Sequence, residues 1–326
     1  MKKLARLLLL GLGFGLLLVL LSRLDVGAVL ASLRHVGWLG FGLVVLAGLA
    51  LTACLASGLY PLLGDKGSVG LALAVRQLRD SAGDILPFTQ IGGIALGMRV
   101  MALGGIAAPR AMAVGVVDVT TELMAQSMFV LIGLELAAPA IQADPHLGPY
   151  LDWLRVAALL FAIGIAVFAY LQLSGSRLAE RTLGTQSFGG RTALFREAIH
   201  HLYRQRGRVA LSFWLHLIGW CASGLWLWLV FRVLGVSIAP TSAIAIQSLL
   251  EALRSAAVFV PAALGVQEAG YAALVPLFGL SPETGVAVSV LRRARDIAVG
   301  IPALLAWQLV EARRVRERMA RERQPN

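Results

Sequence analysis

The 326-residue chain has few charged side chains and only two cysteines. Charged residues make up 14% of the chain and hydrophobic residues 58%, whereas soluble domains contain about 25% charged and about 45–50% apolar residues. No segment is polar enough to form a soluble catalytic domain. Cys54 and Cys221 fall inside apolar runs, where a single cysteine behaves as a small hydrophobic residue. Neither a disulfide nor a cysteine-based metal site is therefore expected.

Motifs that mark enzymes are also missing. The sequence has no His/Cys cluster with metal-ligand spacing, no G-x-S-x-G element and no Walker-type phosphate loop. The chain is therefore not expected to be an enzyme or to use a metal or cofactor. An intramembrane transferase with Glu268 or Asp118 as its base is the one enzymatic alternative, and it depends on carboxylates alone. For His216, near the start of an apolar run, an interfacial position is preferred over a proton relay.

Long apolar runs dominate what is present. Spans are predicted over 7–21, 38–63, 111–136, 153–173, 209–233 and 285–310, because about 20 apolar residues cross a bilayer. With two broken segments added, the sequence predicts an all-α polytopic membrane protein of about seven or eight transmembrane helices in one integral domain. The alternative for the first run, a cleaved signal peptide, is disfavoured because no convincing small-residue cleavage site follows it.

The distribution of Lys and Arg predicts the orientation. With a cytoplasmic N-terminus, 21 of the 29 basic residues fall on the cytoplasmic side, as the positive-inside rule requires. This bias explains the net charge of +11 without a nucleic-acid partner. The protein is then a multi-pass protein of the cytoplasmic (inner) membrane with both termini inside. Segment 64–110 must begin and end inside and segment 242–284 outside, so each is predicted to be a re-entrant loop or a hairpin of two short spans.

Proline and glycine interrupt both of these segments. The predicted helix-breaking residues are Pro87, Gly92, Gly93, Pro261 and Gly265. Broken helices of this kind line cavities inside the membrane. The polar stretch 76–84, which precedes the first break, is predicted to be an interfacial helix.

Charged residues inside the apolar segments indicate a functional site. An unpaired charge at the bilayer centre costs about 3 kcal/mol, so these side chains must face protein, water or a ligand. The predicted substrate-binding residues are Arg254, Gln267, Glu268, Arg292, Arg295, Asp296, Asp118, Glu122 and Arg99. One interpretation is a structural ion-pair network, in which Arg292 pairs with Asp118. The other is a hydrophilic groove whose arginines bind the phosphate or hydroxyl groups of a lipid headgroup.

An offset of 174 positions brings the two halves of the chain into correspondence. Pro87 then falls on Pro261 and Asp118 on Arg292. Because the halves cross the membrane in opposite directions, an inverted repeat is predicted, with the substrate site at its interface near the midplane. The chain is accordingly divided into 1–37 (first span and outer loop), 38–136 (first repeat), 137–208 (fourth span and basic cytoplasmic loop), 209–310 (second repeat) and 311–326 (basic tail).

Both broken segments resemble motifs of a known family. R-S-A-A-V-F-V-P-A-A-L-G-V-Q-E-A at 254–269 resembles the P-G-G-L-G-V-R-E-A motif of the lysylphosphatidylglycerol synthase transmembrane-region family, whose members are flippase-like. L-P-F-T-Q-I-G-G-I-A-L-G-M-R at 86–99 resembles its L-P-x-x-x-G-E-x-x-R element. The sequences of both motifs, together with the later stretch L-R-R-A-R-D-I-A-V-G-I-P, are most similar to those of the hopanoid-biosynthesis-associated members. The chain departs from the family where Ala262-Ala263 replaces Gly-Gly, Gln267 replaces Arg and Ile94 replaces Glu.

The resemblance implies lipid translocation without synthesis, because the soluble aminoacyl-transfer domain of the synthases is missing. The expected function is a transporter or flippase of an amphipathic lipid, such as a hopanoid or a phospholipid derivative. Membrane lipids are then its partners. The alternative is a non-transporting scaffold that holds lipid-biosynthesis enzymes at the membrane.

Overall fold

The computed structural model describes residues 26–85, 90–183, 190–257, 260, 263 and 265–322, and every regular element among them is a helix. The α-helices are α2 (Val26–Ser57), α3 (Tyr60–Leu63), α4 (Val69–Ile85), α5 (Gln90–Leu103), α6 (Ala108–Ala143), α7 (Leu151–Leu183), α8 (Gly190–Arg204), α9 (Arg206–Val233), α10 (Pro240–Ala256), α11 (Val266–Leu274) and α12 (Pro282–Glu322). Short 3-10 helices cover Gly64–Lys66, Gly148–Tyr150 and Val275–Phe278. The predicted span 7–21 and the predicted helix breakers Pro87 and Pro261 lie outside the described residues.

Four helical segments are long and apolar enough to cross a membrane. They are Leu33–Ser57, Ala108–Ala143, Gly148–Gln172 and Arg206–Val233, and each contains most of a span predicted from the sequence. The prediction of an all-α polytopic membrane protein is therefore confirmed. The predicted span 285–310 lies within the 41-residue helix α12, whose charged residues 292–296 make it less apolar than the other four.

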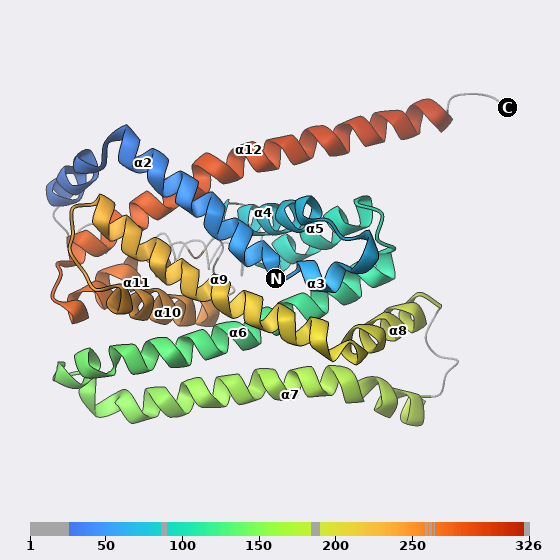
Figure 1. Ribbon diagram of the computed structural model, residues 1–326, viewed down its shortest axis with the longest axis horizontal. Coiled ribbons are helices and arrows are strands. Elements are labelled where there is room, and N and C mark those ends of the chain that lie inside the picture. The colour runs from blue at the N-terminus through green and yellow to red at the C-terminus, as the bar shows by residue number, and fades with distance from the viewer. Residues whose placement is uncertain are drawn as a thin grey trace, which may run out of the picture.

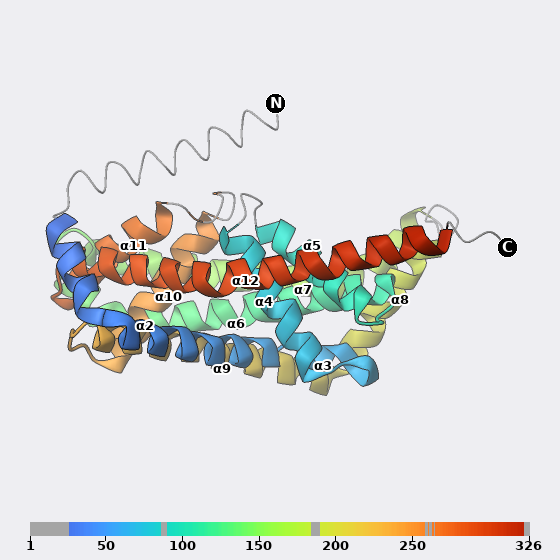
Figure 2. The same ribbon diagram turned by 90° about the horizontal axis from the view of Figure 1, so that it is seen from above.

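The two broken segments are helical hairpins that enter the molecule from opposite ends (Figure 1). α4 and α5 form one hairpin, which starts from the end where α3 and α8 lie. α10 and α11 form the other, which starts from the end where α9 finishes and α12 begins. α12 extends along most of the long axis beside α4 (Figure 2). Because each hairpin reaches only part of the way, side chains near its tip lie in the middle of the molecule.

Two apolar cores lie on either side of a polar layer. The first core joins α2, α9, α10, α11 and α12 through buried residues such as Phe231, Ile246 and Val288. The second joins α3, α4, α5, α6 and α8 through residues such as Leu62, Met101 and Val114. Inside a membrane such cores are stabilised by van der Waals packing between helices. The two cores thus hold the charged layer between them in a fixed position.

The predicted interfacial helix at 76–84 is wrong, because this stretch is the inner part of α4. Only 7% of Arg76 is exposed, and Ser81, Ala82 and Gly83 are buried. Carboxylates on α4 and α6 pair with the arginines of this stretch, which makes their burial tolerable. Arg76 and Arg79, which the orientation count placed on the cytoplasmic side, therefore lie inside the protein.

The prediction that Gly92 and Gly93 break a helix is also wrong, since both lie in the first turn of α5. Gly93 instead allows α5 to approach α4 closely. A Cβ atom at position 93 would overlap the backbone oxygen of Arg79, and backbone cannot move aside as a flexible side chain can.

Gly93→Ala is therefore expected to destabilise the protein, by roughly 1–3 kcal/mol for an overpacked contact. Gly83→Ala, in α4 of the same hairpin, is the matched control, because a Cβ atom there meets no atom within 4 Å. This change should be neutral or stabilising by up to about 1 kcal/mol, since alanine favours helix over glycine. Unfolding in detergent would measure both, and equal stabilities would contradict the close-approach explanation.

One helix boundary matches the 174-residue offset used in the sequence comparison. α6 begins at Ala108, and α12 begins at Pro282, 174 positions later. α4 and α5 precede α6 in the same order in which α10 and α11 precede α12. Proline suits the first turn of α12 because that position needs no backbone N–H. The inverted repeat stays a prediction, with which this order of helices agrees.

Candidate functional site

A cavity of about 440 Å³ lies in the polar layer between the two apolar cores. Five arginines and five carboxylates line it: Arg76, Arg79, Arg254, Arg292, Arg295, Asp80, Asp84, Glu122, Glu251 and Asp296. Apolar and aromatic side chains from α2, α7 and α9 complete the wall, among them Leu55, Phe161 and Trp220. The cavity thus offers both charged hydrogen-bonding groups and an apolar surface.

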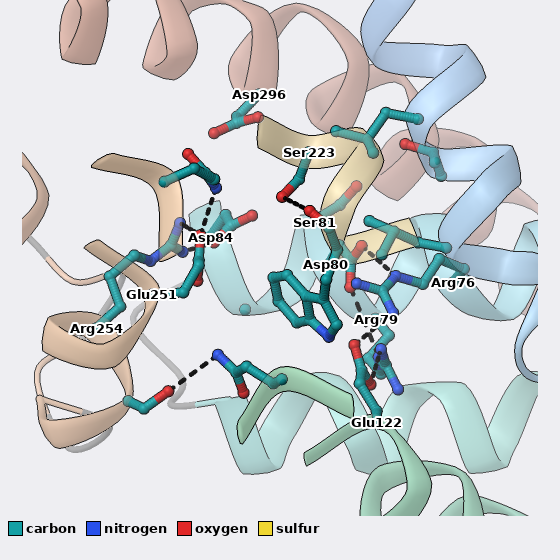
Figure 3. A pocket seen from close by; sticks show the side chains of 18 of the residues that line it. Arg76, Arg79, Asp80, Ser81, Asp84, Glu122, Ser223, Glu251, Arg254 and Asp296 are labelled. Atoms are coloured by element: carbon teal, nitrogen blue, oxygen red, sulfur yellow. Dashed lines mark hydrogen bonds and ion pairs between the residues drawn. The ribbon is translucent and has the colours of Figure 1, made fainter. Parts of the chain in front are cut away.

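On one side of the cavity, Glu122 of α6 binds two arginines of α4 (Figure 3). Its two oxygens lie 2.6 Å from Arg76 Nη1 and 2.6 Å from Arg79 Nη2. Arg76 also pairs with Asp80 one turn away, at 2.6 Å, and Arg79 with Asp118 at 3.0 Å. Arg76, Arg79 and Asp80 share one face of α4, because residues three or four apart lie on the same side of a helix. Asp118 and Glu122 share one face of α6 for the same reason.

On the other side, Arg254 joins the two hairpins. Its Nη2 donates to Asp84 Oδ1 at 2.8 Å, which connects the end of α10 to the end of α4. Its Nη1 donates to Gln267 Oε1 of α11 at 3.4 Å. One guanidinium group thus contacts both hairpins near their tips, as the fork of donors on arginine permits.

The predicted pairing of Arg292 with Asp118 is wrong. Arg292 Nη2 lies 3.1 Å from Glu251 Oε1, and its Nη1 lies 2.9 Å from the hydroxyl of Tyr271. Asp118 pairs with Arg79 on the other side of the cavity. Each buried charge is satisfied mainly within its own half of the molecule, because the helices of one half are its nearest neighbours.

Arg295 fixes α12 against α2. Its Nη1 pairs with Asp296 at 2.8 Å, and its Nη2 donates to the backbone oxygen of Gly48 at 2.5 Å. The guanidinium also lies 5.6 Å from the centre of the Trp226 ring, within the range of a cation–π interaction. The positive charge is therefore compensated although the side chain is largely buried.

The structure distributes the nine predicted binding residues over three environments. Glu122, Arg254, Arg292, Arg295 and Asp296 line the cavity. Asp118, Gln267 and Glu268 are buried beside it but are not in its wall. Arg99 is different, since 54% of its side chain is exposed and it pairs with Glu311 at 2.7 Å.

Glu268 has a structural role at the start of α11. Its Oε2 accepts the backbone N–H of Gly265 at 2.9 Å, while Oε1 pairs with Arg293 at 3.0 Å. Gly265 precedes the helix with φ of 75°, a left-handed conformation that favours glycine. The predicted break at Gly265 therefore coincides with the beginning of α11.

The predicted binding residues included none of the α4 wall and omitted Glu251. Arg76, Asp80 and Asp84 are four residues apart and therefore share one face of α4, which is the signal that was available. The 174-residue offset also places Asp80 on Arg254, and both line the cavity.

His216 is not interfacial as predicted, because its side chain is fully buried on α9. Its Nε2 lies 3.0 Å from Asp118 Oδ1, and its Nδ1 has no hydrogen-bond partner among the described residues. Among the described residues, no group of three or more His, Cys, Asp or Glu side chains could hold a metal ion. The chemistry that the cavity offers is therefore charge-assisted hydrogen bonding.

One protein family matches this chain. The family model described as "Lysylphosphatidylglycerol synthase TM region" matches residues 4–303. No curated protein and no solved structure matches the chain.

Proposed function

The chain belongs to the family of lysylphosphatidylglycerol synthase transmembrane regions, and we propose that it is a transporter or flippase of an amphipathic lipid. Membership makes it a membrane protein of lipid-related function. The finer proposal is that it moves a hopanoid or phospholipid derivative across the cytoplasmic membrane, with both termini in the cytoplasm, and that it does so without enzymatic activity.

The observation that carries this proposal is the mixed lining of the cavity. A lipid headgroup needs hydrogen-bond donors and acceptors inside the membrane, and ten charged side chains supply them. The attached hydrocarbon needs an apolar surface, which Leu55, Phe161 and Ile165 supply. Phe161 and Ile165 belong to α7, whose apolar stretch is not buried against the rest of the protein. An acyl chain next to α7 can therefore stay in contact with the bilayer.

The two hairpins support the same proposal. They enter from opposite ends and meet at the cavity, where Asp84 and Arg254 join them. In transporters built from inverted repeats, access alternates by movement of one repeat against the other around a central site. An ion pair between the hairpins is a contact that such a movement would break and remake.

Asp84→Asn tests the proposal in vesicles that contain the full chain and a panel of labelled lipids. The panel should include phosphatidylethanolamine, phosphatidylglycerol, lysylphosphatidylglycerol and a polar-headed hopanoid. The change keeps the volume of the side chain but removes a charged partner of Arg254 at the cavity wall. Asparagine can still accept a hydrogen bond from Arg254, but it carries no charge, so the pair no longer holds the hairpin tips firmly in the arrangement that forms the cavity. A loss of about 1.5–3 kcal/mol in forming this site should lower the rate of lipid movement about 10- to 100-fold.

Asp152→Asn is the control, because that carboxylate pairs with Arg155 on the surface and is 91% exposed. It should transport at the wild-type rate. A non-transporting scaffold predicts instead that no lipid in the panel moves faster than in empty vesicles, even with wild-type protein. Equal rates for the two variants and the wild type would show that the cavity is not the path of the headgroup.

A further inference from the structure

His216 is a buried base next to the charged layer, and the proposed lipid movement makes no use of it. It is 0% exposed, so it does not face solvent. The α2–α3 turn closes one side of the ring: a Cβ atom at Gly58 would come within 2.5 Å of Nδ1. The imidazole thus fills a space that only a glycine leaves open.

The orientation of the ring assigns its two nitrogens different roles. An ionised carboxylate only accepts hydrogen bonds, so Nε2 carries the hydrogen that is donated to Asp118 Oδ1. Nδ1 then has a free lone pair, and no donor in the described part of the chain bonds to it. This nitrogen is the available site for one more proton.

The ion-paired side chains in and beside the cavity include one more carboxylate than arginine. The arginines are Arg76, Arg79, Arg254, Arg292, Arg293 and Arg295. The carboxylates are Asp80, Asp84, Asp118, Glu122, Glu251, Glu268 and Asp296. The second set is larger by one. Asp80 and Asp84 are partly exposed in the cavity, whereas Asp118 beside His216 is buried, where an uncompensated charge is costly.

The groups that face His216 make a positive charge favourable at this position. Asp118 contacts the ring directly, and Glu122 lies on the next turn of α6. Arg79 of α4 is also positive and would repel an imidazolium. Its charge is compensated, however, by ion pairs with both carboxylates. The α2–α3 turn contributes Gly58, which has no charge. Histidine changes its charge between about pH 5 and 8 in ordinary surroundings, so its side chain is suited to reversible proton binding.

We propose that His216 is a proton-binding site and that its proton controls how firmly Asp118 holds Arg79. With neutral His216, the Asp118 carboxylate has one cationic partner, the Arg79 guanidinium at 3.0 Å. When a movement of the surrounding helices admits water and Nδ1 takes up a proton from it, Asp118 is shared between imidazolium and guanidinium. Arg79, which lines the cavity, is then freer to bind an acceptor on a ligand. Proton binding and lipid binding are thereby coupled through one arginine.

The proton site can be tested without any transport measurement. The full chain would be labelled with ¹³C in its histidine rings and studied by NMR in lipid nanodiscs. His216→Gln identifies the His216 signal by its loss, since glutamine can still donate to Asp118. We expect the wild-type His216 signal to move between pH 8 and pH 5, as protonation of the ring requires. A signal that stays in one place over this range overturns the proposal.

The dependence on Asp118 and the coupling need separate measurements. In Asp118→Asn the carboxylate that balances the imidazolium is gone, so the movement of the signal between the same two pH values should shrink or vanish. An unchanged movement in a folded variant contradicts the charge-balance argument, and the wild-type titration remains decisive if the variant does not fold.

The coupling of proton binding to lipid binding goes beyond the proposed function, but its measurement through lipid movement rests on that function. Lipid movement should depend on pH in the wild type and lose that dependence in His216→Gln. A moving NMR signal without lipid movement at any pH supports the proton site and overturns the flippase. Lipid movement with the same pH dependence in both proteins overturns the coupling.

Discussion

Replacing Glu122 by glutamine is expected to destabilise the protein by about 3–5 kcal/mol, the typical cost of removing one partner from a buried ion pair. Glu122 binds both Arg76 and Arg79 at 2.6 Å. Glutamine has nearly the same size but no charge, so the two guanidinium groups lose a shared counterion in the middle of the molecule. The free energy of unfolding in detergent or bicelles measures the effect, and lipid movement should be lost as well.

Glu135→Gln is the matched control on the same helix. Glu135 also pairs with an arginine, Arg155, at 2.8 Å. Its side chain is 60% exposed, and exposed ion pairs contribute little to stability. Little change in unfolding is therefore expected. Similar losses in both variants would mean that burial of the Glu122 cluster does not determine its contribution.

The Arg292–Glu251 pair should show strong coupling in a double-mutant cycle. Arg292→Ala leaves Glu251 without its partner at 3.1 Å, and Glu251→Ala leaves Arg292 without that carboxylate. Each single change should cost about 3–5 kcal/mol. The double variant should recover part of this loss, because no unpaired charge from this pair remains. Thermal unfolding of the wild type, both single variants and the double variant gives the coupling free energy.

Arg292→Ala combined with Asp118→Ala provides the comparison. Asp118 binds Arg79 and His216, whereas Arg292 binds Glu251. The two changes should therefore be nearly additive, within about 0.5 kcal/mol. Stronger coupling of Arg292 to Asp118 than to Glu251 would contradict the arrangement of the two clusters.

The sequence by itself determined the class of fold and most of the spans. Runs of apolar residues such as 111–136 and 209–233 have no stable alternative to a helix in a bilayer, because every backbone polar group must be satisfied there. Their positions in α6 and α9 follow directly. Half of the binding site could be inferred in the same way, since charges such as Glu122 and Arg292 inside an apolar run must face the interior.

Only the tertiary structure decided the other half of the site and the partners of each charge. The stretch 76–84 is polar enough for a membrane surface, and its burial in α4 depends on carboxylates that lie about 40 residues away on α6. Likewise, the sequence places Arg292 and Asp118 at equivalent positions of two halves, which says nothing about the distance between them. Ion pairing depends on distances of a few ångströms, and the packing of the two hairpins against α6 and α12 sets those distances.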